Sequence, residues 1–221
     1  MKGKLIVIEG LDGSGKSTQE KLLKEKLEAD GFKINSIKLP NYDDPACEPV
    51  KMYLAGRFGS DPSDVNAYAA SSFFAVDRFV SYNCYWKEAY LNGEIFIADR
   101  YTTSNAYHQL TKTDKSEWDS YLNWLEDFEY NKLGIPKPDA VIYLDMPIEV
   151  SQKLMSGRYN GDETKKDIHE KNTDYLNACR EAADYACSKL GWSRVECSHD
   201  GEPLSIEEIS AKIYAVVSKA I

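Results

Sequence analysis

The 221-residue sequence predicts an α/β fold, a parallel five-stranded sheet with helices on both faces. Short apolar runs rich in β-branched residues alternate with amphipathic helical patterns along the whole chain, which is typical of this fold class. The runs are continuously apolar, as in parallel strands that are covered on both sides. The first run leads into a glycine-rich loop and then a helix. Since no linker or repeat divides the pattern, we expect residues 1–221 to form one domain.

The first half of the chain contains three of the predicted strands. Its opening strand, "KLIVIEG", is followed by a helix on which Leu23 and Leu27 share a face and after which Gly31 is a suitable stop. Pro40 ends the second strand. In order, we predict strand 4–10, helix 17–30, strand 32–39, helices 50–55 and 64–91, and strand 94–100.

The second half continues the alternation. A helix with Trp118, Tyr121 and Leu125 on its inner face precedes the buried strand "DAVIYLD". We predict helix 115–131, strand 139–145, helices 147–156 and 172–190, strand 192–197 and helix 205–219.

Composition excludes several classes of protein. A formal net charge of −9 argues against non-specific binding of nucleic acid, which needs clustered basic residues. No apolar run reaches the length of a membrane span, so we expect no membrane association. The five cysteines form no C-x-x-C pair, which indicates reduced thiols and a cytoplasmic protein.

The loop "EGLDGSGKST" has the G-x-x-x-x-G-K-[ST] spacing of a phosphate-binding P-loop. Its glycines let successive backbone N–H groups turn onto phosphate oxygens. Lys16 can reach the β- and γ-phosphates of ATP, and the Ser17 hydroxyl can bind Mg²⁺. The predicted ATP-binding residues are Gly10, Leu11, Asp12, Gly13, Ser14, Gly15, Lys16, Ser17 and Thr18.

A P-loop alone admits several functions. A GTPase would need an N-K-x-D sequence, but "NKLG" has Gly134 in place of the aspartate. A motor or helicase would need a longer chain. A small phosphotransferase remains, and the alternatives are a kinase for another nucleotide or deoxynucleoside and a P-loop binding module without an acceptor.

Two predicted strands end in an aspartate, where ligands of open α/β folds bind. Asp99 is followed by Arg100, and a carboxylate for Mg²⁺ beside a guanidinium for a phosphate suits a site where two phosphates meet. Asp145 precedes "MPIEV" and is better explained as the start of a helix. We predict Asp99 and Ser17 as metal ligands, with Glu9 at the end of the first strand as a third.

Phe74 and Arg78 lie four residues apart on the long predicted helix. Together they could stack on a base and bond its carbonyl edge, or they could be a core aromatic and a surface arginine. Asn105, in the polar segment "TTSN", could pair with a base edge or cap a helix.

Five segments together resemble the thymidylate kinase family, over essentially the whole chain. They are the P-loop with Asp12, "NYDD", "FFAVDRF", "DRYTTSNAYHQ" and "DIHEKNTDYL", in this order and spacing. The resemblance implies a P-loop kinase three-layer fold and transfer of the γ-phosphoryl group of ATP to dTMP with Mg²⁺. It also implies a homodimer that pairs through helices, to which surplus aromatics such as Phe79 and Tyr85 on the long helix could contribute.

The resemblance also implies roles for individual residues. Phe74 would stack on thymine, Arg78 would contact its carbonyl edge, and Asn105 would face the base. Tyr175 would crowd the 2′ position of the sugar and favour deoxyribose. Residues 198–205 would lie against adenine.

The phosphate groups would meet residues from three segments. Arg100 and Tyr42 would contact the dTMP phosphate, and Asp12 would lie near this phosphate and the deoxyribose hydroxyl. The family often has an arginine where this chain has Asn41, so one phosphate contact is lost or moved. It also usually has an aromatic residue in place of His108.

The polar segment 156–170 is predicted to be a mobile lid. Some members of the family carry a catalytic arginine in the P-loop and others carry it in the lid. Because Gly13 follows Asp12, Arg158 in the lid is the better candidate, ahead of Lys165 and Lys166. The predicted catalytic residues are Lys16, Arg100, Arg158 and Asp12.

Overall fold

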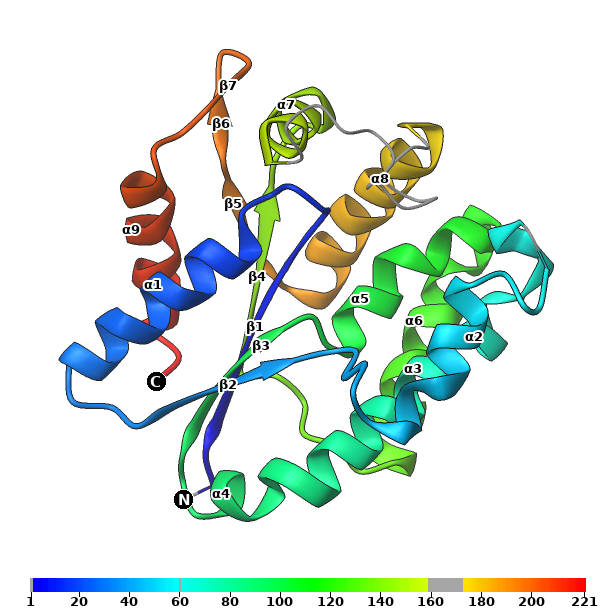
Figure 1. Ribbon diagram of the computed structural model, residues 1–221, viewed down its shortest axis with the longest axis horizontal. Coiled ribbons are helices and arrows are strands. Elements are labelled where there is room, and N and C mark those ends of the chain that lie inside the picture. Colours follow the sequence, from blue (N-terminus) through cyan, green and yellow to red (C-terminus); the bar gives the residue numbers. More distant parts are fainter. Residues whose placement is uncertain (1, 60, 159–172) are drawn as a thin grey trace.

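The computed structural model describes residues 2–59, 61–158 and 173–221 and contains a five-stranded sheet (Figure 1). The strand order is β2-β3-β1-β4-β5, and every neighbouring pair is parallel. All carboxyl ends of the strands therefore lie at one edge. The strands are β1 (Lys4–Gly10), β2 (Ile34–Lys38), β3 (Ile95–Asp99), β4 (Ala140–Asp145) and β5 (Ser193–Glu196). This arrangement confirms the predicted fold class.

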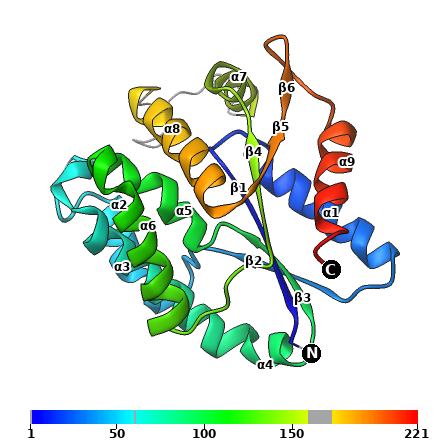
Figure 2. The same cartoon turned by 180° about the vertical axis from the view of Figure 1, so that it is seen from behind.

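Helices cover both faces of the sheet (Figures 1 and 2). One face carries α1 (Lys16–Ala29) and α9 (Ile206–Val217), which pack on each other. The opposite side carries α2 (Glu48–Leu54), α3 (Ala67–Ser81), α4 (Lys87–Leu91), α5 (Thr102–His108), α6 (Trp118–Glu126) and α8 (Thr173–Leu190). Helix α7 (Ile148–Arg158) lies at the carboxyl edge of the sheet.

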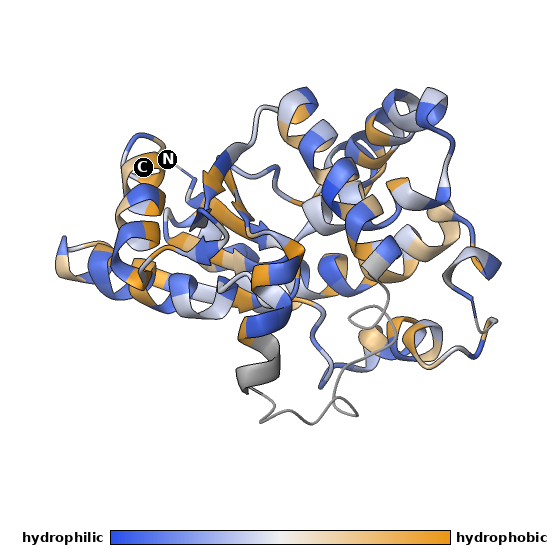
Figure 3. Ribbon diagram, turned by 90° about the horizontal axis from the view of Figure 1, so that it is seen from above, coloured by the Kyte–Doolittle hydropathy of each residue, from blue (hydrophilic) through white to orange (hydrophobic). Residues whose placement is uncertain are grey.

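The central strand β1 shows why these runs are apolar throughout. Ile6 and Ile8 pack with Leu23 of α1, whereas Leu5 and Val7 pack with Trp86 on the opposite face. The four β1 side chains are fully buried. Seen from above, the apolar strands lie between helices whose outer faces are polar (Figure 3). Burial on both faces explains a continuous apolar run.

Two predicted long helices contain a change of helical type. The helix predicted over 64–91 consists of a 3-10 turn at Pro62–Asp64, then α3, a π-helical turn at Tyr82–Trp86, and α4. The helix predicted over 115–131 consists of a 3-10 turn at Lys115–Glu117, α6, and a π-helical segment at Asp127–Lys132. Hydrophobic periodicity locates such helices but does not reveal one inserted residue.

Sequence patterns missed α5 and a hairpin formed by β6 (Ser198–His199) and β7 (Glu202–Pro203). Short 3-10 turns also occur at Pro45–Cys47, before α2, and at Leu110–Lys112. Cys179 and Cys187 are buried in the core. Within the described residues, we find no helix with the length and apolar character needed to cross a membrane.

Candidate active site

A cavity of about 850 Å³ opens at the carboxyl edge of the sheet. This volume is in the range of small-ligand sites, and the position is where ligands of open α/β folds bind. The described lining residues come from distant parts of the chain: Asp12–Gln19, Lys38–Pro40, Tyr42, Tyr53, Leu54, Phe74, Asp77, Arg78, Asp99–Tyr101, Ser104, Asn105, His108, Gln109, Met146, Leu154, Tyr175, Pro203–Ile206 and Ile209.

The P-loop forms one wall of the cavity. A Cβ atom at Gly10 would come within 2.5 Å of the Ser14 hydroxyl oxygen and 3.0 Å of the Leu144 carbonyl oxygen, so the turn needs glycine there. Gly13 and Gly15 have φ angles of 80° and 92°, which favour glycine. Helix α1 begins at Lys16 without a side-chain cap, so its first N–H groups are available to an anion.

Lys16 is held against its own loop. Its Nζ donates to the carbonyl oxygens of Gly10 at 2.9 Å and Leu11 at 3.2 Å. It also lies 3.5 Å from Asp12 Oδ1. Burial lowers the pKa of Lys16. Gly10 and Leu11 are absent from the described cavity lining, and their carbonyl groups contact Lys16 instead.

Ser17 and Asp99 lie together beside the P-loop. The Ser17 hydroxyl donates to Asp99 Oδ2 at 3.3 Å, and Asp99 Oδ1 is buried with no hydrogen-bond partner among the described residues. A buried carboxylate oxygen without a partner is costly unless a ligand fills the position. A hydroxyl and a carboxylate are oxygen ligands that suit Mg²⁺, so this pair fits the metal of MgATP.

Glu9, predicted as a further metal ligand, is hydrogen-bonded to residues at the start of α5. It is fully buried, and its carboxylate accepts from the Tyr101 N–H, the Thr103 and Ser104 hydroxyls and the Tyr107 hydroxyl, at 2.6–3.2 Å. It is also not one of the described lining residues. Glu9 therefore fixes the start of α5, and its assignment as a metal ligand stays a prediction.

Arg100 and Asp12 connect the two halves of the cavity. Arg100 Nη2 donates to Asp12 Oδ1 at 2.6 Å. Burial opposes the charge of Asp12, but Arg100 and Lys16 outweigh it and hold its pKa well below the usual range. Arg100 has a φ of 70°, a conformation that non-glycine residues rarely adopt and that tends to occur at functional sites.

Phe74 and Arg78 form the wall opposite the P-loop. Phe74 is half-buried and meets the ring of Tyr53 edge-on, with 6.2 Å between centroids. Arg78 is only 3% exposed and forms a two-pronged ion pair with Glu129, with both N···O distances 2.6 Å. Burial opposes the charge of Arg78, but Glu129 raises its pKa. The alternative of a surface arginine is wrong.

Asn105 lies inside α5 rather than at its cap. It lines the cavity and is buried, and its Nδ2 donates to the Ser71 carbonyl oxygen at 3.3 Å. The helix-cap alternative for Asn105 is therefore wrong, since the N-cap residue of α5 is Tyr101.

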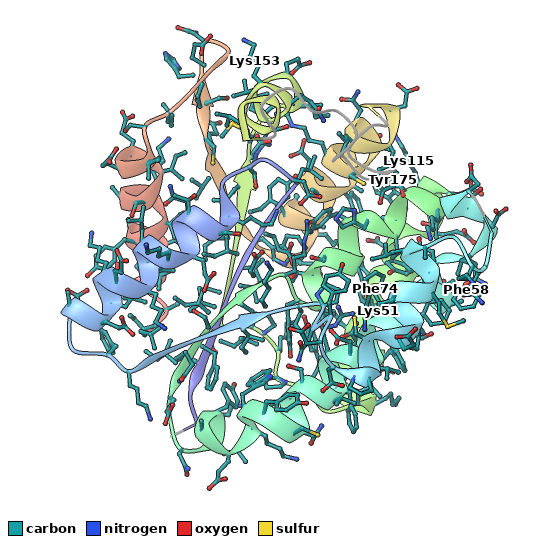
Figure 4. The ribbon with its side chains drawn as sticks, in the orientation of Figure 1. Lys51, Phe58, Phe74, Lys115, Lys153 and Tyr175 are labelled. Atoms are coloured by element: carbon teal, nitrogen blue, oxygen red, sulfur yellow. The ribbon has the colours of Figure 1, made fainter. Side chains whose placement is uncertain are left out.

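His108 and Tyr175 form a wall between Arg100 and α8. His108 Nδ1 is 3.0 Å from the Tyr175 hydroxyl, and Nε2 is 3.4 Å from Arg100 Nη1. Because a guanidinium only donates, the contact with Arg100 is a hydrogen bond only in the neutral tautomer that carries its proton on Nδ1. Figure 4 labels Tyr175 on α8 and Phe74 on α3, and both side chains line the cavity.

Two other predictions have different outcomes. Asp145 is 5% exposed and is paired with Arg180 Nε at 3.0 Å and Arg194 Nε at 2.9 Å. It is therefore the centre of a structural ion pair and does not begin α7.

Arg158 is the last residue of α7. Its side chain and the remainder of the predicted lid, residues 159–170, lie outside the described part of the chain.

Sequence reasoning missed three charged residues here. Lys38 lines the cavity at the end of β2, in register with Asp99. Asp77 is 2% exposed and accepts from the Asn41 N–H at 3.2 Å, and burial raises its pKa. Glu129 lies behind the wall, paired with Arg78. Of these three residues, only Asp77 is adjacent in sequence to a predicted site residue, Arg78.

The far end of the cavity is formed by the segment after β7. Leu204, Ser205 and Ile206 line it, and Gln19 of α1 donates to the Ile206 carbonyl oxygen at 3.0 Å. This places the end of the segment predicted to lie against adenine beside the P-loop.

A P-loop between the first strand and the first helix of a parallel sheet, facing a second wall of aromatic and basic side chains, defines a P-loop phosphotransferase. The family model described as thymidylate kinase matches residues 8–208. The chain therefore belongs to the thymidylate kinase family.

Several relatives agree with this assignment. The chain is 29% identical to a thymidylate kinase of Mycobacterium tuberculosis, over 85% of this chain and 87% of that one. It is 32% identical to a probable thymidylate kinase of Saccharolobus solfataricus, over 80% and 84%. The solved thymidylate kinase structure from Candida albicans matches with a TM-score of 0.71 at 21% identity, over 99% of this chain and 92% of that one, which supports the fold.

Proposed function

We propose that this cavity carries out the thymidylate kinase reaction, with ATP on the P-loop and dTMP on the wall that contains Phe74. The reaction transfers the γ-phosphoryl group of ATP to dTMP and gives dTDP and ADP. The observation that carries this arrangement is the carboxylate of Asp12, which lies 2.6 Å from Arg100 Nη2 and 3.5 Å from Lys16 Nζ. Asp12 thus contacts both Lys16, the cation for ATP, and Arg100, the cation for dTMP, at the point where the two substrates meet.

On the donor side, Lys16 and the N-terminus of α1 bind the β- and γ-phosphates. Ser17 and Asp99 hold the Mg²⁺ of MgATP, which adds positive charge against the phosphates when it is bound. The adenine lies toward Leu204 and Ser205.

On the acceptor side, Phe74 stacks on thymine while Arg78 and Asn105 bond its polar edge. Arg100 and Tyr42 hold the phosphate, and Tyr175 lies beside the sugar and favours deoxyribose. Lys38, exposed at the end of β2, is a cation that can take the place of the phosphate contact missing at Asn41.

The reaction needs positioning and charge neutralisation more than proton transfer. The attacking group is an ionised phosphate oxygen, so no general base is required. Holding both substrates in line converts a bimolecular step into an effectively unimolecular one. Arg158, from the predicted lid over 156–170, adds the last cation, and closure of the lid excludes water.

The test is release of ADP from ATP with dTMP, dUMP, UMP, AMP and thymidine as acceptors. We expect the highest kcat/KM with dTMP and only slow hydrolysis of ATP without an acceptor. Preference for thymidine would indicate a nucleoside kinase, and ADP release that does not depend on any acceptor would indicate a binding module.

We also propose that the chain acts as one domain and forms a homodimer in the cytoplasm. Val76 and Phe79 on the outer side of α3 are 47% and 40% exposed, which supports an interface there. Trp86 and Tyr90, from the same long predicted helix, are core residues. Light scattering should give twice the mass of 25.0 kDa, and Phe79→Glu should give monomers.

The five unbridged cysteines support a reducing compartment.

A further inference from the structure

Glu129 is a buried carboxylate with no place in the reaction described above. It lies in the π-helical segment Asp127–Lys132 and is fully inaccessible to solvent. A buried charge requires partners of opposite charge and hydrogen-bond donors. π-Helical turns insert one residue into a helix and occur frequently at functional sites. The partners of Glu129 therefore indicate its purpose.

Those partners are side chains of the cavity wall. Arg78 Nη2 donates to Glu129 Oε1 and Arg78 Nε to Oε2, both at 2.6 Å. Asn105 Nδ2 is 3.5 Å from Oε1, and the Thr102 hydroxyl donates to Oε2 at 2.7 Å. Arg78 and Asn105 come from α3 and α5 and line the cavity, whereas Glu129 is absent from the described lining. Glu129 thus joins two helices from behind the wall.

This contact fixes the direction of the Arg78 guanidinium. Of its five N–H groups, two point to Glu129 and one, on Nη1, points to the Tyr101 carbonyl oxygen at 3.3 Å. Two N–H groups remain, one on each terminal nitrogen. Since the guanidinium is planar, its pairing with Glu129 on one edge determines where these remaining donors lie.

The same carboxylate fixes the orientation of the Asn105 amide. Both groups near Nδ2, the Ser71 carbonyl oxygen and Glu129 Oε1, can only accept hydrogen bonds. The NH₂ group must therefore face them, which leaves Oδ1 as an acceptor for a ligand. The wall presents donors from Arg78 next to an acceptor from Asn105.

We propose that Glu129 is a positioning residue that sets which pyrimidine the acceptor site takes. A base edge with a carbonyl oxygen beside an N–H, as in thymine and uracil, matches a donor next to an acceptor. An edge with an amino group beside an unprotonated ring nitrogen, as in cytosine, presents the reverse pattern. This inference rests on the proposed placement of the base against Phe74.

The main test is Glu129→Gln, which keeps the side-chain volume and removes the charge. A glutamine cannot offer two acceptor oxygens, so Arg78 loses one partner and the Asn105 amide becomes free to turn. We expect kcat/KM for dTMP to fall roughly 10- to 100-fold, mainly through KM, the size expected for misplaced charged hydrogen bonds. The ratio of kcat/KM for dTMP to that for dCMP should fall at least about tenfold, while KM for ATP stays within about twofold.

Thr102→Val is the matched control, because Thr102 donates to the same carboxylate and does not line the described cavity. It should lower thermal stability without changing the dTMP to dCMP ratio. If folded Glu129→Gln keeps the wild-type ratio, or if KM for ATP rises together with KM for dTMP, Glu129 has a structural role only and the proposal is wrong.

A second variant covers the case in which Glu129→Gln does not fold. Replacing both partners, Arg78→Met with Glu129→Leu, removes the buried charges together and is usually tolerated. It should bind ATP normally and lose its preference for dTMP over dCMP. Retention of that preference would overturn the proposal. If the wild type itself prefers another acceptor, the proposed binding of dTMP against Phe74 is wrong, and this result is distinct from a failure of the role of Glu129.

Discussion

Asp99 and Asp145 occupy equivalent positions at the carboxyl ends of β3 and β4, the two parallel strands that flank β1, yet their surroundings differ. Asp145 is neutralised by Arg180 of α8 and Arg194 of β5. The carboxylate of Asp99 accepts one hydrogen bond among the described residues, from Ser17 at 3.3 Å, and its second oxygen has no partner there. The strand end provides the position, and the arginines around it decide between a structural ion pair and a ligand site.

The largest expected effect is that of Asp99→Asn. We expect kcat to fall roughly 1,000-fold because the metal of MgATP loses its charged partner. The melting temperature should change by less than about 2 °C, since only one weak hydrogen bond is lost. Steady-state ADP release and thermal unfolding measure both. Equal loss of activity in Asp99→Asn and Asp145→Asn would remove the distinction between the two strand ends.

Arg158→Ala tests whether the site at Asp99 depends on a cation from the predicted lid. Asp145, by contrast, is paired with Arg180 and Arg194 of the folded core. We expect kcat to fall roughly 100-fold, as for loss of one group that stabilises transition-state charge. KM for dTMP should stay within about threefold. Lys165→Ala is the control and should have a smaller effect. Unchanged turnover of Arg158→Ala would show that the catalytic cation lies elsewhere.

Asp145→Asn should affect stability rather than catalysis. Arg180 and Arg194 are partly exposed, with side-chain exposures of 32% and 41%, so we expect a loss of about 1–3 kcal/mol, between the values for surface and buried pairs. For a chain of this size, this is a fall of about 3–10 °C in melting temperature. With dTMP saturating, kcat should stay within about twofold. A large loss of turnover in folded protein would place Asp145 in the reaction.

The smallest expected effect is the pH dependence of the stability difference between the wild type and Asp145→Asn. Burial opposes the charge of Asp145, but hydrogen bonds from Arg180 and Arg194 lower its pKa below the usual value. The unfolded chain therefore takes up the proton first as the pH falls, and the stabilisation is complete above about pH 4. The melting-temperature difference between wild type and Asp145→Asn should be constant from pH 7 to 5 and shrink below pH 4. A difference that grows in acid would contradict this pairing.

The two aspartates also show how far the sequence predicts the molecule. Apolar runs predicted the sheet because parallel strands are buried on both faces, and the P-loop spacing predicted Lys16 and Ser17. Helix α5 was missed because "TTSNAYH" has no apolar stripe, and the helix is held instead by Glu9, about ninety residues away. The same limit applies to Glu129 and Arg78, which are 51 residues apart and pair only in the folded chain.

Calorimetric titration of ADP with and without Mg²⁺ is the most direct test of the difference between the strand ends. Wild type, Asp99→Asn and Asp145→Asn would be compared at one pH and ionic strength. We predict that Mg²⁺ tightens ADP binding equally in wild type and Asp145→Asn, and that Asp99→Asn loses this gain. A full gain in Asp99→Asn, or its loss in Asp145→Asn, would contradict the assignment of the metal to Asp99.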